Sequence, residues 1–324
     1  MKARMNENMK IIPITNLSNN IDDNNNVLIL SSSFESRCLT ISKELKNKNF
    51  EKVIVVENKK GSELISKNGT ELAVSFSNST LLKIDFDDQI AFAHQLVKEI
   101  CELQNEEINV LIDITTFTHE TLLVCLKTLY CNSIINKITC LYLNASEYCK
   151  NKPVEQKWLS KGAKGVHPIF RFSGMLYPSL ETHLIIIVGY EYERAFEVIS
   201  QIEPNSLTLI YGTTEDAITE KDKSANQHYL YLLKEMAFEY QNIESCIINC
   251  YDPQKTSKAL SEIYSQYSDK NIIVIPMNNK MSTAGVFLST IDNEDIQVCY
   301  APAVIYNEDN YSEPGNDCYI LNLK

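Results

Sequence analysis

The sequence predicts an α/β protein made of two tandem Rossmann-like domains with mostly parallel sheets. Three observations carry this prediction: short β-branched runs alternate with helix-like segments of ten or more residues, the order of these segments occurs twice, and the two copies start at matching offsets. Alternation of buried strands with crossover helices is typical of βαβ units. The 324 residues are enough for one large or two ordinary domains.

The first copy is predicted over residues 26–145. Its strands are expected at 26–32, 52–58, 79–86, 108–116 and 137–144, and its helices at 36–49, 88–104 and 119–132. The strand segments are rich in Val, Ile and Leu, as buried parallel strands are. This pattern predicts that the first half forms one Rossmann-like domain.

The second copy is predicted over residues 183–308 and repeats the same order. Its strands are expected at 183–189, 206–213, 245–252, 271–277 and 295–304, and its helices at 192–203, 224–241, 255–267 and 282–291. Each strand starts 154 to 166 residues after its counterpart in the first copy. A spacing preserved through successive strands favours internal duplication over coincidence.

Three segments lie outside the two copies. Residues 1–25 are Asn-rich and are expected to form a polar tail, and residues 309–324 are expected to form a C-terminal strand or tail. Residues 146–182 contain Trp158, the chain's single tryptophan, and an excess of Lys and Arg. This segment is either a solvated basic linker or insertion, or a basic lid over an anionic ligand.

Composition excludes several classes of function. A formal net charge of −12 argues against nonspecific binding to duplex nucleic acid, because that affinity comes mainly from Lys and Arg. The longest apolar runs are far shorter than the roughly 20 residues that span a bilayer. The N-terminal residues lack an apolar signal core, so a cytoplasmic protein without membrane contact is expected.

The cysteines are expected to be buried free thiols. The ten Cys include no CxxC pair and no companion His at zinc spacing. A reducing compartment fits this use of cysteine, and no metal site is predicted. The loops that follow the first strands lack a GxGxxG fingerprint, so a nicotinamide or flavin dehydrogenase is disfavoured and no cofactor is expected.

Two stretches, "LILSSSFESRCLTI" (28–41) and "IIIVGYEYERAFEV" (185–198), share one strand-turn-helix pattern. Ligands of open parallel sheets bind where such loops enter helices. The candidate ligand-binding residues after the first strands are Ser32, Ser33, Arg37, Gly189 and Arg194. The chain has only four arginines, and a guanidinium binds phosphate or carboxylate bidentately. Alternatively, Arg37 and Arg194 pair with Glu35 and Glu193 to fix the turns.

A second set of candidates follows the fourth strands. In the first copy these are Thr115, Thr116 and Thr118, whose hydroxyls either cap the next helix or present donors to a phosphate or base. His119 and Glu120 come next; His119 is either a proton-transfer group or a hydrogen-bonded structural residue. In the second copy the same place holds Asn278 and Lys280, a candidate phosphate ligand.

These loops resemble the ligand loops of CARF domains, the Rossmann-like sensors associated with CRISPR systems. The resemblance rests on the polar turns after strand one and on "DITTFT" and "PMNNK" after strand four, over residues 26–305. Two such halves in one chain also resemble SAVED domains. The first copy departs from the CARF pattern, since it lacks the glycines and lysine of the usual strand-four turn.

The resemblance implies a sensor of a nucleotide-derived second messenger, such as a cyclic oligonucleotide, in bacterial anti-phage defence. Since no segment is left for an effector, output would need a separate effector protein or self-assembly into a homo-oligomer. A second hypothesis is a ring-nuclease-like, metal-independent phosphodiesterase with His119 or Glu120 as acid or base. A third is a ligand-free scaffold subunit of a defence complex.

Overall fold

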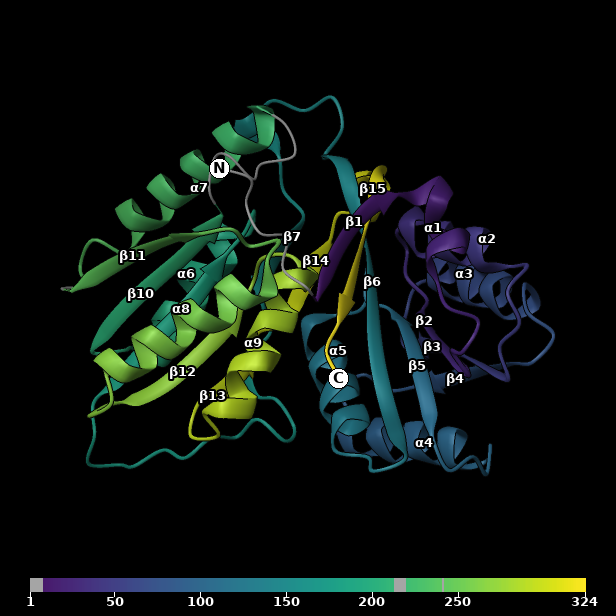
Figure 1. The fold of residues 1–324 in the computed structure, drawn as a ribbon. Helices are drawn as coiled ribbons and strands as arrows, with labels where there is room; N and C mark the ends of the chain where they lie inside the picture. Colours follow the sequence, from purple (N-terminus) through teal and green to yellow (C-terminus); the bar gives the residue numbers. More distant parts are fainter. Residues whose placement is uncertain (1–7, 213–219, 241) are drawn as a thin grey trace, which may run out of the picture. The chain divides into compact units, whose positions relative to one another are not determined.

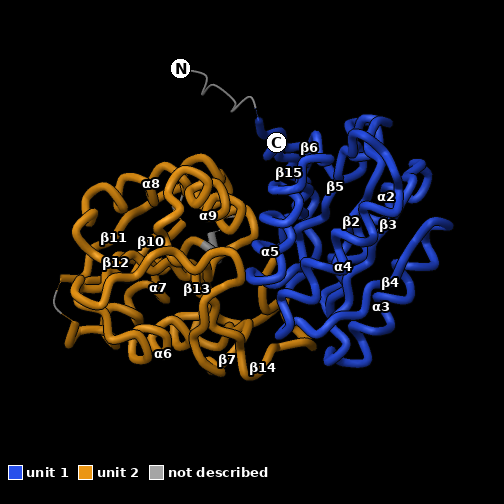
Figure 2. Tube along the Cα trace, turned by 90° about the horizontal axis from the view of Figure 1, so that it is seen from below, with its two compact units in different colours: residues 1–146, 312–324 blue, residues 147–311 orange. Residues whose placement is uncertain are grey.

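The computed structural model describes residues 8–212, 220–240 and 242–324. The chain divides into two compact units, coloured separately in Figure 2. Unit 1 comprises residues 1–146 and 312–324, and unit 2 comprises residues 147–311. The C-terminal segment thus belongs to the same unit as the N-terminal half of the chain.

Unit 1 is built on a seven-stranded sheet with the order β1-β15-β6-β5-β2-β3-β4. The five strands β2 to β6 run parallel to one another. Strand β1 pairs antiparallel with β15. The strands are β1 (Met9–Pro13), β2 (Val27–Ser31), β3 (Lys52–Asn58), β4 (Ser79–Ile84), β5 (Ile108–Asp113), β6 (Ile135–Tyr148) and β15 (Ser312–Asn322). Every residue of β2 is buried, as its position in the middle of the sheet requires.

The helices of unit 1 are α1 (Leu17–Asn20), α2 (Thr40–Leu45), α3 (Glu63–Val74), α4 (Gln89–Cys101) and α5 (His119–Tyr130). The sequence reading assigned no element to residues 59–78, where the structure has α3. Asn68 and Gly69 lie inside this helix, and both residue types are poor helix formers. Gly69 lies so close to the Glu57 side chain that an added Cβ would be 2.1 Å from its Oε2. Packing against β3, rather than propensity, therefore holds α3 in place.

The segment expected as a polar tail contains β1 and α1. Its apolar residues Ile12, Ile14, Leu17 and Ile21 are buried in the hydrophobic core of unit 1. Residues 1–7 of the segment lie outside the described residues. The Asn-rich composition of the segment outweighed the short apolar run at residues 11–14, and Leu17 and Ile21 stand among polar residues.

Unit 2 is built on a six-stranded sheet with the order β11-β10-β9-β12-β13-β8. Strands β9 to β13 pair in parallel, and β8 adds antiparallel to β13. The strands are β8 (His167–Pro168), β9 (Thr182–Val188), β10 (Ser206–Gly212), β11 (Ile243–Ile248), β12 (Asn271–Pro276) and β13 (Gln297–Tyr300). The buried residues of β9 and β12 form the centre of this sheet.

The helices of unit 2 are α6 (Tyr192–Ile202), α7 (Glu220–Met236), α8 (Pro253–Gln266) and α9 (Lys280–Asp292), drawn in Figure 1. Helix α6 packs beside α7, and α8 packs beside α9. The chain leaves β9 in one direction through β10 and β11, then returns through β12 and β13, so right-handed crossovers place the two helix pairs on opposite faces.

The basic segment 146–182 contributes structure to unit 2. It supplies η3 (Val154–Gln156), β7 (Ser160–Ala163) and β8, and β7 pairs antiparallel with β14 (Ala303–Tyr306) to form a two-stranded sheet. Strand β7 packs on helix α6. The segment was predicted as a linker or insertion, and the part that includes β7 and β8 is built into the fold of unit 2.

The two units share one strand topology. In each, the parallel strands taken in chain order lie side by side as third, second, first, fourth and fifth. Equivalent strands begin at Val27 and Thr182, Lys52 and Ser206, Ser79 and Ile243, Ile108 and Asn271, and Ile135 and Gln297. The predicted fold class, two Rossmann-like domains with mostly parallel sheets, is confirmed. Among the described residues, no helix is long and apolar enough to cross a membrane.

Candidate functional site

In unit 1 the loop after β2 is closed by helix α3. The Ser32 hydroxyl donates to the Ile65 carbonyl at 2.5 Å, and the Asn68 carboxamide donates to the Ser33 carbonyl at 2.7 Å. Ser33 Oγ accepts from the Glu35 amide at 3.2 Å. Both serines are buried. These two predicted ligand residues are therefore occupied by contacts within the unit.

Arg37 is also committed to internal partners. Its Nη2 and Nε donate to Glu35 Oε2 at 2.6 and 3.0 Å, and its Nη1 donates to the Leu143 carbonyl at 3.1 Å. Glu35 also accepts from the Ser312 hydroxyl at 2.5 Å. The ion pair is buried on both sides. In unit 1 the contacts of Arg37 therefore match the alternative interpretation, in which the arginine pairs with Glu35 to fix the turn.

The hydroxyls after β5 serve the backbone. Thr115 Oγ1 accepts from the Leu143 amide at 3.0 Å, Thr116 donates to the Ser31 carbonyl at 3.0 Å, and Thr118 caps α5 by accepting from the Thr121 amide at 3.1 Å. His119 and Glu120, in the first turn of α5, are buried. Glu120 accepts a hydrogen bond from Gln89. The structure brings these residues to one edge of the unit 1 sheet, but Thr115 and Thr116 bond the backbone of β6 and β2, and Thr118 caps α5.

Asp113, the last residue of β5, has a strongly shifted pKa. Burial raises the pKa to about 6, while hydrogen bonds from Thr115 and the charge of Arg37 act in the opposite direction. The Thr115 amide donates to Asp113 Oδ1 at 3.0 Å. Asp113 therefore anchors the turn into α5.

In unit 2 the loops after β9 and β12 touch directly. A Cβ added at Gly189 would lie 2.4 Å from the Met277 carbonyl oxygen, so only glycine fits. The Asn278 carboxamide donates to the Val188 carbonyl at 2.5 Å. Asn279 caps α9 by accepting from the Ser282 amide at 2.8 Å, and Lys280 is the first residue of that helix. Gly189, Asn278 and Lys280 thus lie together at the carboxyl edge of the unit 2 sheet.

Arg194 occupies the first turn of α6 and differs from Arg37 in one respect. Its Nη2 forms a buried ion pair with Glu191, which also accepts from the Ser160 hydroxyl of β7. Its Nε and Nη1 have no hydrogen-bond partner among the described residues, although the residue is only 3% exposed. The acid that pairs with Arg194 is Glu191 and not Glu193, which the sequence reading had considered.

The guanidinium of Arg194 stays charged in this position. Burial lowers its pKa, but the Glu191 carboxylate and the nearby phenols of Tyr300, Tyr306 and Tyr311 raise it by more, so the pKa lies above the ordinary value. A buried, charged donor with open N–H groups favours an acceptor from outside the protein.

A cavity of about 300 Å³ opens beside this ion pair, at the carboxyl end of β9; we call it the β9 pocket. It lies within unit 2, between the turn into α6, the second half of α7 and the segment that leads into β7. The lining residues are Glu155, Gln156, Lys157, Trp158, Ser160, Lys161, Tyr190, Glu191, Tyr192, Glu193, His228, Tyr229 and Leu232.

Aromatic rings dominate one side of the β9 pocket. Tyr192 stacks on Tyr229 with 5.4 Å between ring centroids, and Tyr190 lies 5.5 Å from Tyr229. The Tyr229 hydroxyl donates to the carbonyl of Val154 at 2.7 Å, which fixes the ring under η3. Tyr190 and Tyr192 are half-buried.

The charged residues of the β9 pocket have distinct roles. Lys157 is buried and its ammonium donates to the Tyr148 carbonyl at 2.7 Å, so it holds the segment before β7. Lys161 is exposed and lies 5.4 Å from the centre of the Trp158 ring. Glu155 and Glu193 are exposed carboxylates at the rim. The pocket therefore offers one accessible ammonium beside aromatic and acceptor groups.

The sequence reading missed most of this pocket. Its candidates Gly189 and Arg194 adjoin the pocket in sequence, Trp158 and Lys161 lie in the segment interpreted as a linker or insertion or as a basic lid over an anionic ligand, and Tyr229 had no predicted role. The signal that was available is the pair of tyrosines in "VGYEYER", which flank Glu191 in the turn that was singled out. The contribution of α7 depends on the packing of α6 with α7 and has no sequence pattern.

Within the described ranges, no three His, Cys, Asp or Glu side chains are grouped so that they could hold a metal ion. All ten cysteines are free, and seven of them are buried. Burial raises the pKa of the Cys38 thiol to about 12 and that of Cys299 to about 11. These thiols stay protonated and unreactive at neutral pH.

No family model matches the chain, and no curated protein matches it. Among solved structures, Can2 from Sulfobacillus thermosulfidooxidans in complex with cyclic tetra-adenylate aligns with a TM-score of 0.30 and 13% identity, over 41% of this chain and 36% of that one. The cytoplasmic domain of a prokaryotic cation chloride cotransporter aligns with a TM-score of 0.26 and 10% identity, over 86% of this chain and 95% of that one. Similarities this weak carry no argument about function.

Proposed function

We propose that the protein is a sensor subunit that binds a nucleotide-derived ligand in the β9 pocket of unit 2. The observation that carries the proposal is the aromatic-lined pocket at the carboxyl end of a parallel sheet, whose lining residue Glu191 forms a buried ion pair with Arg194. Ligands of this fold class bind at that edge.

The comparison with Arg37 supports this reading of Arg194. Each arginine pairs with a glutamate of its own turn. Each glutamate also accepts a hydrogen bond from the hydroxyl of a serine in a strand. The Nη1 of Arg37 donates to the Leu143 carbonyl. Among the described residues, no acceptor is bonded to the Nε or Nη1 of Arg194. An unmet buried donor costs about 1–3 kcal/mol, and more when it is charged. A phosphate oxygen that reached Arg194 past Glu191, its partner in the pocket wall, would remove this cost.

The rings of the β9 pocket favour a base as the second half of the ligand. Stacking of a base on an aromatic side chain contributes about 1–3 kcal/mol. A volume of about 300 Å³ is at the lower end for small-molecule sites, so the pocket suits one nucleotide unit at a time. Lys161, beside Trp158, would contact a phosphate at the pocket mouth.

The wider role is part of the same proposal. A place in bacterial anti-phage defence, a cyclic oligonucleotide as ligand, and output through a separate effector or self-assembly rest on the resemblance of the loops to CARF domains and of the two halves to SAVED domains. A cytoplasmic setting rests on the short apolar runs and the polar N-terminal residues. His119 and Glu120, the candidates for phosphodiesterase chemistry, are buried in the first turn of α5. We therefore propose ligand binding rather than catalysis.

Fluorescence of Trp158 tests the proposal, because this single tryptophan lines the β9 pocket. The full chain is titrated with AMP, with cyclic tetra-adenylate and with ribose 5-phosphate, which lacks a base. We expect saturable quenching by one of the adenine nucleotides and at least tenfold weaker binding of ribose 5-phosphate.

Two variants and one control accompany the titration. Arg194→Met and Lys161→Met are expected to weaken binding at least tenfold, while Arg171→Met, which removes an exposed arginine of the same unit, should leave it unchanged. Lys161 is exposed, so its variant should fold normally. No saturable binding of either nucleotide, or binding insensitive to both substitutions, would refute the proposed site.

A further inference from the structure

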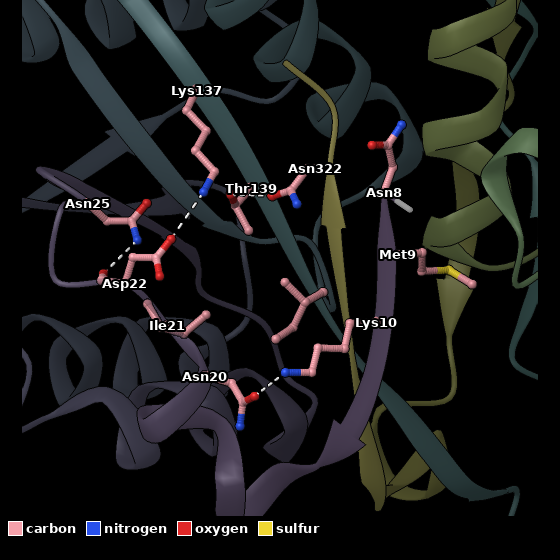
Figure 3. A pocket seen from close by; sticks show the side chains of 11 residues that line it. Asn8, Met9, Lys10, Asn20, Ile21, Asp22, Asn25, Lys137, Thr139 and Asn322 are labelled. Carbon is pink, nitrogen blue, oxygen red and sulfur yellow. Dashed lines mark hydrogen bonds and ion pairs between the residues drawn. The ribbon is translucent and has the colours of Figure 1, made fainter. Parts of the chain in front are cut away.

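A second cavity lies in unit 1, at the opposite edge of the sheet from the predicted ligand loops. Its volume is about 210 Å³, and its walls come from the starts of β1 and β6, the end of β15 and the segment that joins α1 to β2. Figure 3 shows this cavity, which we call the amino-edge pocket. It is independent of the β9 pocket and of the function proposed for unit 2.

The two sides of the amino-edge pocket carry complementary groups. The strands contribute the ammonium groups of Lys10 and Lys137, and the segment before β2 contributes the Asp22 carboxylate and the Asn25 carboxamide (Figure 3). Two ammonium groups thus line the same small cavity as a carboxylate and a carboxamide. Ile21 and Ile320, both buried, provide apolar surface between them.

Asn25 has an unmet hydrogen-bonding group. Its Nδ2 donates to the Asp22 carbonyl at 2.9 Å, but its Oδ1 has no partner in the part of the chain that the structure describes, although the residue is only 7% exposed. Figure 3 shows the carboxamide nitrogen turned toward Asp22, with the oxygen directed away from that bond. A buried acceptor without a donor is costly, so an occupant of the pocket has to supply an N–H or O–H group.

The lysines of the pocket are held by weak contacts. Lys137 Nζ lies 3.3 Å from Asp22 Oδ2, and Lys10 donates to Asn20. Asp22 is 69% exposed and Lys137 36% exposed at their side chains, and such exposed ion pairs contribute little to stability. A ligand that inserts between Lys137 and Asp22 would therefore lose little by separating them.

We propose that the amino-edge pocket binds a small zwitterion of amino-acid size. Its carboxylate would lie at the ammonium group of Lys137, and its ammonium group would donate to Asp22 and to Asn25 Oδ1. Its side chain would lie against Ile21 and Ile320. The volume is below the range of about 300–1,000 Å³ that suits larger ligands, which excludes a nucleotide from this pocket.

Ligand-observed saturation-transfer NMR on the full chain tests this proposal. Each proteinogenic L-amino acid is used separately as a probe, and the best binder is compared with its analogue without the amino group and its analogue without the carboxylate. For valine these analogues are 3-methylbutanoate and isobutylamine. We expect at least one amino acid to bind, and both analogues to bind at least tenfold more weakly.

Variants place the binding in the pocket. Lys137→Met and Asp22→Asn, at partly exposed positions, should each weaken binding at least tenfold, and Asn25→Leu should abolish it. Lys43→Met, at an exposed lysine elsewhere in unit 1, should bind as the unchanged chain does. The proposal is overturned if no amino acid binds, if the carboxylate-only analogue binds as tightly as the amino acid, or if binding persists in both Lys137→Met and Asp22→Asn.

Discussion

Arg37 and Arg194 show how far single residues can be interpreted from a sequence. Their matching positions in two repeats identified both turns as special, and the paired acids Glu35 and Glu191 lie in those turns. Which donors remain open depends on distant backbone: Leu143 lies 106 residues from Arg37 and supplies the acceptor that Arg194 lacks. No local pattern could have distinguished the two arginines.

His183 carries a pH dependence that belongs to unit 2. It is fully buried in β9, stacks on Tyr267 and contacts the hydroxyls of Ser206 and Thr208 at 2.7 and 3.0 Å. Burial, with a smaller effect of Lys270, lowers its pKa from 6.5 to about 4. Between these values the unfolded chain binds more protons than the folded one, so stability is present above pH 6.5 and is lost as the pH falls toward 4.

Urea unfolding followed by Trp158 fluorescence measures this effect, since the tryptophan reports on unit 2. We expect the free energy of unfolding to fall by up to about 3 kcal/mol between pH 6.5 and pH 4. His183→Gln should remove most of this fall, whereas His94→Gln, at an exposed histidine of unit 1, should retain it. An equal fall in His183→Gln and in the unchanged chain would show that other groups cause it.

At the scale of elements, the turns that end β9 and β12 have to approach closely. Gly189→Ala places a Cβ 2.4 Å from the Met277 carbonyl oxygen, a backbone atom that cannot move aside alone. We expect unit 2 to lose about 1–3 kcal/mol of stability, as overpacked sites do. The measurement is the urea midpoint by Trp158 fluorescence.

Gly212→Ala is the matched control for this substitution. Gly212 ends β10, and its nearest atom to an added Cβ is 3.6 Å away, an ordinary contact. Its effect should be well below that of Gly189→Ala. Equal midpoints for the two variants would mean that the loops after β9 and β12 yield easily, and that the close approach does not define the edge of the β9 pocket.

The strands were predictable, and two other kinds of element were not. Buried parallel strands such as β2, β9 and β12 appear as uninterrupted Val, Ile and Leu runs, and their helices follow at regular intervals. Helix α3 was missed because Asn68 and Gly69 weaken its local signal. Strand β7 was missed because a strand that pairs with β14, over 140 residues later, has no pattern of its own.

At the scale of the molecule, the two units share one fold, but the carboxyl edges of their sheets differ. The units share their strand order, which fixes where loops meet, but not the side chains that fill those loops. In unit 1, α3 and the threonines close the carboxyl edge; in unit 2, the corresponding edge opens into the β9 pocket. The repeat explains why the sequence pointed to the same edge in both units and why it could not tell which of them holds a pocket.

The most direct test of the ligand-sensor proposal is mass spectrometry of the small molecules released when the purified full chain is denatured. We predict that a compound with a nucleobase and a phosphate is released from the unchanged chain and from Arg171→Met, and that it is depleted at least tenfold in Arg194→Met. Release of no such compound, or equal release from Arg194→Met, would contradict a nucleotide site at the end of β9.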